Sequence, residues 1–509
     1  MASRIATAER ARITDCPVRF GSVRFDSIFS CFFIPLSKNL GAAKDERRSA
    51  YLADGIADVT TKVASRHVAR ATYLFGRVWS CIDSPRASSE PTYRHVGYRT
   101  DDKFNPPLRT NFADLHRADP CAQIAVDLRL ETAEIWCQPQ GQARGPWIRG
   151  VPLPLPVWAH YESPALTVST VEQYEELAGS VELETQRLLR EHRYDTIGNF
   201  LRFYKDYTAS GEKTLDRFYR KYQPLITHGH HTCVGLGFEL LHRLTDLNKR
   251  FPGIASGLYL VSCEETIGDI AGYVGGPPAA DSGEKEHVLV CLKIEISGRR
   301  GVMLLDPGYH VARVITVMAD KLYPHTGWFT QSDEPNCKKE YNYCLCADDP
   351  DYVEWHERKI QPGALERMQV ALIYVARPYL TAIDVTERRN LVYNRRSLLA
   401  RDTKGHVTAG IYFSVILDMN DAQTFTIFYQ TGNGKKRVKM AFNKFCDSYK
   451  ISSNAEEMEI LAECARQLNI SQDALKDILF ALASIMSDSS FVAQLLAINA
   501  RINTLAEAN

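Results

Sequence analysis

The amino-acid sequence predicts an α+β protein in which helical and strand-forming segments occupy separate parts of the chain. Two regions, at about 165–255 and 453–505, show apolar residues at the 3.6-residue spacing of amphipathic helices. Between them, at about 256–445, short segments of β-type composition alternate with turns that contain Gly or Pro. We therefore expect a helical lobe, a β-rich lobe and a C-terminal helical segment, preceded by a separate region at 1–160.

The composition excludes several classes of function. The 509 residues contain 61 Lys and Arg against 61 Asp and Glu. Proteins that bind nucleic acids strongly usually carry a basic excess, so we expect no nucleic-acid partner. No stretch approaches the roughly 18 apolar residues of a transmembrane helix, so we expect no membrane partner. The 13 cysteines follow no regular disulfide framework, which favours a reducing, cytoplasmic location.

The first 160 residues differ from the rest of the chain. They contain 18 Arg but only 4 Lys, and they include short Pro-bearing stretches such as 151–156. Proline fixes φ and removes a hydrogen-bond donor, so these stretches cannot form the interior of a regular helix or sheet. We expect 1–160 to be poorly ordered or loosely structured.

The helical lobe is predicted to carry a reactive cysteine. A capping-box pattern at Ser169–Glu172 opens a helix that extends to about residue 191. Two shorter helices are expected at about 196–207 and 214–222. The helical periodicity that begins at Leu236 places Cys233 at or just before a further helix N-terminus. The positive end of a helix dipole favours thiolate over thiol, so this location suits a nucleophile.

The β-rich lobe is predicted to supply the partners of this cysteine. A strand is expected at 258–262, and strands at 287–296 and 302–305 flank a turn and form a β-hairpin. Antiparallel pairing brings His287, at the start of one strand, near Asp306, at the end of the next. A thiol nucleophile needs a base, and the base needs an acceptor that fixes its tautomer. The sequence thus predicts Cys233 as nucleophile, His287 as base and Asp306 as orienting carboxylate.

The block from Cys233-Val-Gly-Leu-Gly-Phe-Glu239 to Asp306-Pro-Gly-Tyr309 resembles the arylamine N-acetyltransferase superfamily, within the wider Cys-His-Asp transglutaminase-core fold. The resemblance covers about 165–485, and only the block around the three residues is specific. It implies a cysteine-proteinase-like core, with a helical lobe that carries the Cys, a β-barrel or antiparallel sheet that carries the His and Asp, and a helical C-terminal piece.

The resemblance also implies a function. The implied function is thiol-dependent acyl transfer, in which an acyl-enzyme forms on Cys233 and the acyl group passes to an amine or similar small acceptor. Acyl-CoA, in particular acetyl-CoA, would be the donor, so both partners would be small molecules, and no metal is expected.

Two motifs depart from the family pattern. His230-His231-Thr232 stands where the family has Arg-Gly-Gly, and Asp306–His310 reads Asp-Pro-Gly-Tyr-His where the family has Asp-Val-Gly-Phe-Gly. Two alternatives therefore stay open. One is a catalytically silent binding or scaffold descendant of the same fold, and the other is a transglutaminase-like enzyme or cysteine hydrolase.

Two clusters of potential metal ligands are weaker evidence for a functional site than these motifs. One set comprises His228, His230, His231 and Cys233. The other comprises Cys337, Cys344, Cys346 and His356. Neither matches a zinc-site spacing, so we expect no metal site.

Two further segments are open to interpretation. The aromatic residues at 325–343 are equally compatible with a wall of the substrate pocket and with ordinary core or surface positions. The segment 382–396 is rich in Arg, and we expect it to be a solvated structural segment rather than a nucleic-acid-binding one.

Overall fold

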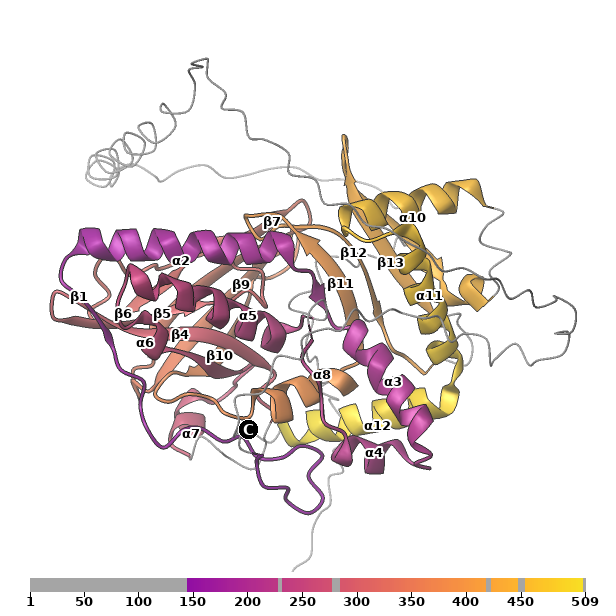
Figure 1. Ribbon diagram of the computed structural model, residues 1–509, viewed down its shortest axis with the longest axis horizontal. Coiled ribbons are helices and arrows are strands. Elements are labelled where there is room, and N and C mark those ends of the chain that lie inside the picture. The colour runs from indigo at the N-terminus through magenta and orange to yellow at the C-terminus, as the bar shows by residue number, and fades with distance from the viewer. Residues whose placement is uncertain (1–143, 228–230, 277–283, 418–422, 447–453, 507–509) are drawn as a thin grey trace, which may run out of the picture. The chain divides into compact units, whose positions relative to one another are not determined.

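The computed structural model describes residues 144–227, 231–276, 284–417, 423–446 and 454–506 (Figure 1). These residues all belong to one compact unit. A second unit, 32–128, and most of the predicted N-terminal region 1–160 lie outside the described residues.

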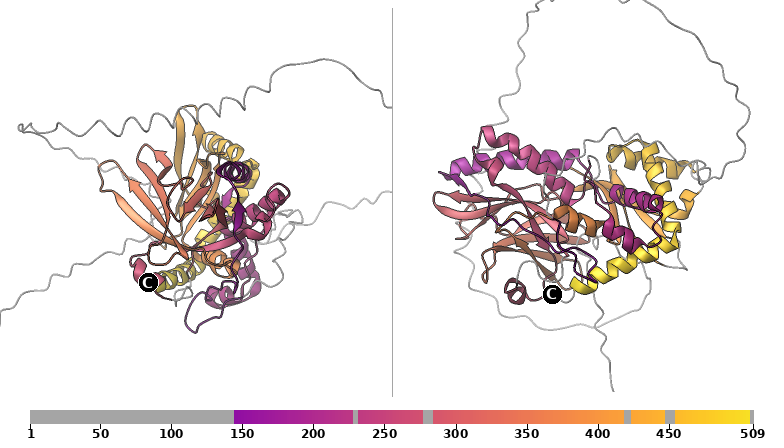
Figure 2. Two further views of the ribbon diagram at one scale, coloured as in Figure 1. Left: turned by 90° about the vertical axis from the view of Figure 1, so that its left-hand side faces the viewer. Right: turned by 60° about the horizontal axis from the view of Figure 1, so that its bottom comes forward.

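Two sheets contain the described strands. The larger sheet has nine strands in the order β6-β5-β4-β3-β10-β9-β8-β7, with β1 added beside β4. It is antiparallel except for the parallel β1–β4 pair, and it curls into a half-barrel (Figure 2). Its strands are β1 (Leu166–Val168), β3 (Leu258–Glu264), β4 (His287–Ile296), β5 (Arg299–Leu305), β6 (Ile315–Met318), β7 (Phe329–Glu334), β8 (Cys337–Leu345), β9 (Tyr352–Ile360) and β10 (Arg367–Tyr374).

The smaller sheet is antiparallel and has five strands, in the order β14-β13-β12-β11-β2. Its strands are β2 (Tyr194–Asp195), β11 (Arg395–Arg401), β12 (Val407–Ser414), β13 (Thr424–Thr431) and β14 (Gly434–Ala441).

The helices divide between the two sheets. Helices α2 and α5 pack on the nine-stranded sheet and share a core with it, whereas α3, α4 and the C-terminal helices α10–α12 share a core with the five-stranded sheet (Figures 1 and 2). The α-helices are α2 (Val171–Glu191), α3 (Gly198–Ser210), α4 (Leu215–Lys221), α5 (Cys233–Thr245), α6 (Ile254–Gly257), α7 (Ile270–Val274), α8 (Arg388–Val392), α10 (Ala455–Gln467), α11 (Gln472–Ser487) and α12 (Ser489–Ala506). Two 3₁₀-helices, η2 (Asp246–Lys249) and η4 (Phe442–Cys446), and one π-helix, η3 (Ala382–Glu387), also lie in the described ranges. Mixed helices and antiparallel sheet make this an α+β fold, as the sequence predicts.

The capping box of α2 is present, one residue later than predicted. Thr170 is the N-cap, and its hydroxyl accepts a hydrogen bond from the Gln173 backbone N–H at 3.2 Å. The Gln173 side chain in turn accepts from the Ser169 N–H at 3.0 Å. The return bond therefore goes to the residue before the N-cap, so this is a variant of the capping box in which glutamine takes the place of glutamate.

The predicted hairpin is confirmed as β4 and β5. Ser297 and Gly298 both adopt positive φ, at 49° and 78°. A two-residue turn with both φ values positive matches the twist of the strands that it joins. The pairing runs from Ile296 opposite Arg299 to Val290 opposite Leu305, so Asp306 leaves β5 on the side where β4 begins.

The prediction that 382–396 is a solvated segment is wrong. This segment forms the π-helix η3, helix α8 and the start of β11, and most of its charged side chains are buried. Asp384 pairs with Arg388 at 2.6 Å, and Glu284 pairs with Arg389 at 2.7 Å. One of these acids belongs to the segment and the other comes from a distant part of the chain, and such pairing is the condition for burying the arginines.

Among the helices of the described ranges, none is by itself both long and apolar enough to cross a membrane. Helices α11 and α12 meet that criterion only as a pair bent by 83°. Their apolar residues belong to the core beside the five-stranded sheet.

Candidate functional site

Cys233 is the first residue of α5, as the sequence predicts. The Thr232 hydroxyl caps the helix by accepting from the Val234 N–H at 3.3 Å, and the Leu236 N–H closes the first turn on the Thr232 carbonyl. The Cys233 side chain is only 3% exposed. The thiol therefore lies at the positive end of a helix dipole, where a thiolate is favoured.

His287 and Asp306 are hydrogen-bonded neighbours. His287 Nε2 lies 2.9 Å from Asp306 Oδ1, and both side chains are buried. The same oxygen accepts from the Tyr309 N–H at 2.9 Å, which fixes the carboxylate in place. The other ring nitrogen of His287, Nδ1, is not used by Asp306, and the His287 ring and Cys233 meet at Gly308.

The charge state of His287 follows from these neighbours. Burial alone would lower the pKa of the imidazole, but the charge and hydrogen bond of Asp306, together with Cys233, raise it to about 10. A protonated imidazole beside the sulfur is the partner that a thiolate needs at neutral pH. The structure thus brings together the three residues that the sequence selects.

A glycine lets the two reactive side chains meet. A Cβ atom on Gly308 would lie 2.7 Å from Cys233 Cβ and 2.7 Å from His287 Cε1. Real Cβ atoms do not approach other heavy atoms so closely, and the Cys233 side lies on a fixed helix end. Only glycine fits between the Asp306 turn and this pair.

Two residues beside the thiol were missed by the sequence analysis. Asn390 Nδ2 lies 3.9 Å from Cys233 Sγ. Glu387, the last residue of η3, is fully buried and accepts hydrogen bonds from Thr232, Asn199 and Asn390. Glu387 therefore positions both the cap of the Cys233 helix and the amide that faces the sulfur.

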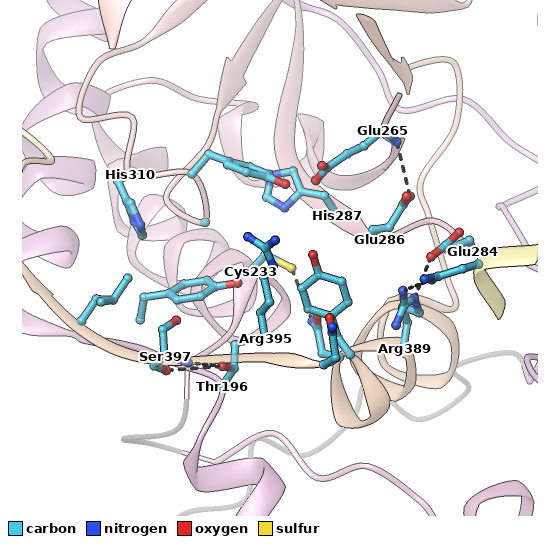
Figure 3. A pocket seen from close by; sticks show the side chains of 18 residues that line it. Thr196, Cys233, Glu265, Glu284, Glu286, His287, His310, Arg389, Arg395 and Ser397 are labelled. Atoms are coloured by element: carbon cyan, nitrogen blue, oxygen red, sulfur yellow. Dashed lines mark hydrogen bonds and ion pairs between the residues drawn. The ribbon is translucent and has the colours of Figure 1, made fainter. Parts of the chain in front are cut away.

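Cys233 and His287 open into a cavity of about 190 Å³ (Figure 3). Its residues come from both sheets and from α8 and α12. They are Tyr194, Thr196, Cys233, Glu265, Glu284, Glu286, His287, Gly308, Tyr309, His310, Arg389, Asn390, Tyr393, Asn394, Arg395, Ser397, Leu399 and Asn503. The aromatic segment 325–343 contributes none of them, because Tyr341 and Tyr343 pack in the core instead. The cavity is of a size that suits small substituents rather than a large polymer.

Carboxyl groups dominate one wall of the cavity. Glu284 is neutralised by Arg389, which also donates to Asn499 at 2.8 Å. Glu286 accepts from the Glu265 N–H at 3.3 Å, and neither Glu265 nor Glu286 forms an ion pair within the described part of the chain. Burial raises the pKa of Glu265 to about 8 and raises that of Glu286 well above its usual range. Figure 3 shows both side chains beside His287.

The turn Asp306–His310, which departs from the family pattern, contains a non-glycine residue with a left-handed backbone conformation. His310, where the pattern has its last glycine, adopts a φ of 64°. Arg401 holds this turn by donating to the Pro307 carbonyl at 2.8 Å and by contacting His310 Nδ1 at 3.2 Å. Burial, followed by the charge of Arg401, lowers the pKa of His310 well below its usual range, so the ring that lines the cavity is neutral.

The histidine cluster upstream of Cys233 lies mostly outside the described residues, which resume at His231. The His231 side chain is buried, and its ring packs against that of His192 at 4.6 Å between centroids.

Comparisons with known proteins give one distant likeness. No family model matches the chain, and no curated protein matches it. Among solved structures, the chain is similar to the arylamine N-acetyltransferase from Mycobacterium abscessus, with 10% sequence identity and a TM-score of 0.28. The match covers 59% of this chain and 88% of that chain. This is a weak, distant relationship of fold, and it carries no information on activity.

Replacing Gly308 by alanine is expected to separate Cys233 from His287, because the new Cβ would occupy space that both side chains use. The rate at which Cys233 reacts with iodoacetamide at pH 7 should fall by more than about ten-fold, the order of effect that a sub-ångström misplacement has on a reacting pair. Gly179→Ala in α2 is the matched control, since a Cβ there meets no atom within 4 Å. An unchanged labelling rate in Gly308→Ala would show that the contact is not needed.

The ion pair of His287 predicts a pH-dependent stability. A histidine whose pKa is raised in the folded state stabilises the protein fully below its unfolded pKa of about 6.5, and this contribution is lost as the pH rises through about 10. Asp306→Asn keeps an acceptor for Tyr309 but removes the charge. The difference in unfolding free energy between wild type and variant should therefore be largest near pH 6 and shrink toward pH 10 in urea titrations.

The exposed Asp320 provides a control for that experiment. Its hydrogen bond with Arg299 lowers its pKa to about 2, so its charge does not change between pH 6 and 10. Asp320→Asn should show a constant difference from wild type across this range. A constant difference for Asp306→Asn as well would contradict the proposed charge on His287.

Proposed function

We propose that this protein is a thiol-dependent acyltransferase that carries the acyl group on Cys233. The observation that supports this most strongly is the contact of a helix-start cysteine with a histidine that is itself bonded to a buried carboxylate, all at one cavity. This arrangement supplies a nucleophile, a proton acceptor and a group that orients it. The cysteine-proteinase-like core implied by the sequence resemblance agrees with these roles.

The reaction has two steps. The Cys233 thiolate attacks the carbonyl carbon of an acyl donor and forms a thioester bond, while the bond between the carbonyl and the leaving group breaks. His287, protonated beside Asp306, gives its proton to the leaving group. In the second step an acceptor amine attacks the thioester, His287 takes its proton, and the Cys233 thiolate is regenerated.

The groups around the sulfur fit the charge that develops in these steps. A tetrahedral intermediate places negative charge on the former carbonyl oxygen, next to the attacking sulfur. The N-terminus of α5 and the Asn390 amide, 3.9 Å from Cys233 Sγ, are donors beside the sulfur that could stabilise this charge. The buried Glu387 fixes both through Thr232 and Asn390.

The carboxyl wall favours an amine as the acceptor. Glu265 and Glu286 lie beside His287 without an ion-pair partner among the described residues, and burial disfavours their charged forms. A cationic acceptor would restore favourable interactions for both. Such an amine would enter as the ammonium, favour the carboxylate form of Glu265, and transfer its proton to that carboxylate before it attacks. Acyl-CoA as the donor rests on the sequence resemblance alone.

The formation of an acyl-enzyme tests the proposal. Incubation of the full chain with acetyl-CoA should add one acetyl group to Cys233, as measured by intact-mass spectrometry and peptide mapping. Cys233→Ala should abolish this adduct, and His287→Ala should slow its formation by about 100-fold or more, the contribution typical of a general acid–base residue. Cys446→Ser, which removes an exposed thiol, is the control and should behave like wild type.

The other readings give different results. An adduct that is released by water as fast as by any amine would identify a hydrolase. Absence of an adduct with short-chain acyl thioesters, together with iodoacetamide labelling of Cys233 no faster than that of the other cysteines, would overturn the enzyme proposal and favour a binding protein.

Glu265→Gln is expected to reduce transfer to cationic amines selectively. The variant keeps the size of the side chain but cannot ionise, whereas an approaching ammonium group would favour the carboxylate form of Glu265. The kcat/KM for a diamine acceptor should fall by more than about ten-fold, whereas the rate of acyl-enzyme formation should change little. Equal losses for a diamine and for a neutral aromatic amine would show that Glu265 does not select the acceptor.

A further inference from the structure

A second group of reactive side chains lies on the strand pair β8–β9. Cys344 stands directly opposite Glu354 in the antiparallel register, and His356 follows two residues after Glu354 on the same strand. Side chains two residues apart point to the same face of a sheet, and directly opposed residues are cross-strand neighbours. The fold therefore gathers a thiol, a carboxylate and an imidazole at one place.

The distances between these groups fit a shared ion. Cys344 Sγ lies 3.7 Å from His356 Nε2, and that nitrogen lies 2.9 Å from Glu354 Oε2. One potential ligand atom from each residue lies within 4.8 Å of the other two. Ligand atoms bonded at about 2.0–2.3 Å to a tetrahedral zinc ion stand about 3.5 Å apart, so small side-chain rotations suffice to bind one.

The chemistry of the three groups selects the class of ion. Thiolate, imidazole and carboxylate together are the ligands that zinc and its analogues prefer, whereas magnesium and calcium favour oxygen alone. A deprotonated Cys344 and Glu354 supply two negative charges, which neutralise a divalent ion. All three side chains are partly buried, so the ion would keep access to solvent and could complete its coordination with water.

We propose that Cys344, Glu354 and His356 form a binding site for a divalent ion of the zinc class. Binding replaces the hydrogen bond between His356 and Glu354 and releases the thiol proton of Cys344. Because the ligands must be deprotonated to bind the ion, affinity falls as the pH is lowered.

The site is separate from the cavity at Cys233. Trp355, between the two β9 ligands, points to the other face of the sheet, where its ring packs 4.9 Å from Tyr309 and 6.5 Å from His287. Glu354 and His356 consequently face away from the catalytic pair. Loss of acyl transfer and loss of metal binding are therefore distinguishable by mutation.

No metal site is predicted here from the sequence, because the spacing of Cys337, Cys344, Cys346 and His356 matches no zinc site. The structure supplies a reason to revise this prediction, because the carboxylate ligand comes from Glu354 and the ligands are arranged by strand register rather than by a short motif. Glu-x-His on one strand and a cysteine on the next give no recognisable pattern along the chain.

Cobalt binding tests the proposal. The full chain, stripped of metal with a chelator, is titrated with Co²⁺ and then with Zn²⁺ in a Cys233→Ala background, which removes the other contact between a thiol and an imidazole. One equivalent of Co²⁺ should give a thiolate-to-cobalt charge-transfer band that Zn²⁺ abolishes. Cys344→Ser should remove the band, and His356→Ala should weaken Co²⁺ binding by more than about ten-fold, the loss that even an outer-shell partner causes.

The controls distinguish the loss of a metal ligand from the loss of the folded structure. Cys446→Ser removes an exposed thiol outside the site and should leave the band and the affinity unchanged. Circular dichroism and the melting temperature of the metal-free variants should match those of the metal-free parent. A charge-transfer band that persists in Cys344→Ser, an affinity unchanged in His356→Ala, or no thiolate-bound Co²⁺ in the parent would each overturn the proposal.

Discussion

The geometry of the Cys233 site depends on the hydrogen bonds that the buried carboxylate of Glu387 accepts. It lies at the end of a π-helix and accepts hydrogen bonds from Thr232 before α5, from Asn199 in α3 and from Asn390 in α8. Burial raises its pKa, and these donors act in the opposite direction. One side chain thus fixes the start of the nucleophile's helix relative to two other helices. π-Helical turns are uncommon, and they occur frequently at functional sites because they place side chains that a regular helix would not.

The cavity is built by both sheets, although the predicted catalytic residues come only from the nine-stranded sheet and the helix packed on it. Arg395, Ser397 and Leu399 of β11 line it from the five-stranded sheet. Arg401, at the end of the same strand, holds the turn that carries Gly308 and His310. The C-terminal helix α12 adds Asn499 and Asn503, which orient Arg389 at 2.8 and 2.9 Å. Cys233 and His287 therefore belong to the half of the fold built on the nine-stranded sheet, while much of the cavity wall belongs to the half built on the five-stranded sheet.

Features encoded by short stretches of sequence could be predicted, and features created by long-range contacts could not. The start of α5 and the β4–β5 hairpin depend on neighbouring residues, so periodicity and turn chemistry placed Cys233, His287 and Asp306 at the right boundaries. Glu387 and Asn390 were missed because they act on Cys233 across more than 150 residues of chain. The Arg-rich segment around them resembled a solvated surface, since a sequence does not show that an arginine pairs in the interior with an acid 105 residues away, as Arg389 does with Glu284. Asp384 and Arg388, four residues apart in a segment with several apolar positions, were the signal available for that burial.

Two acidic residues that line the cavity, Glu265 and Glu286, form no ion pair within the described part of the chain. Arg389 satisfies Glu284, whereas Glu265 and Glu286 receive no cation from the described chain, and burial raises the pKa of both. His287 lies beside these groups, yet its ring is hydrogen-bonded to Asp306, which, after the opposing effect of burial, is the main cause of its raised pKa. Both acids are therefore mainly protonated at neutral pH, and Glu265, with a pKa of about 8, is the one that a nearby positive charge would ionise most readily. A cation beside this wall would favour the ionised form of Glu265, whereas an anion would oppose it. The wall thus differs from the surroundings of the sulfur, where the N-terminus of α5 and Asn390 favour negative charge.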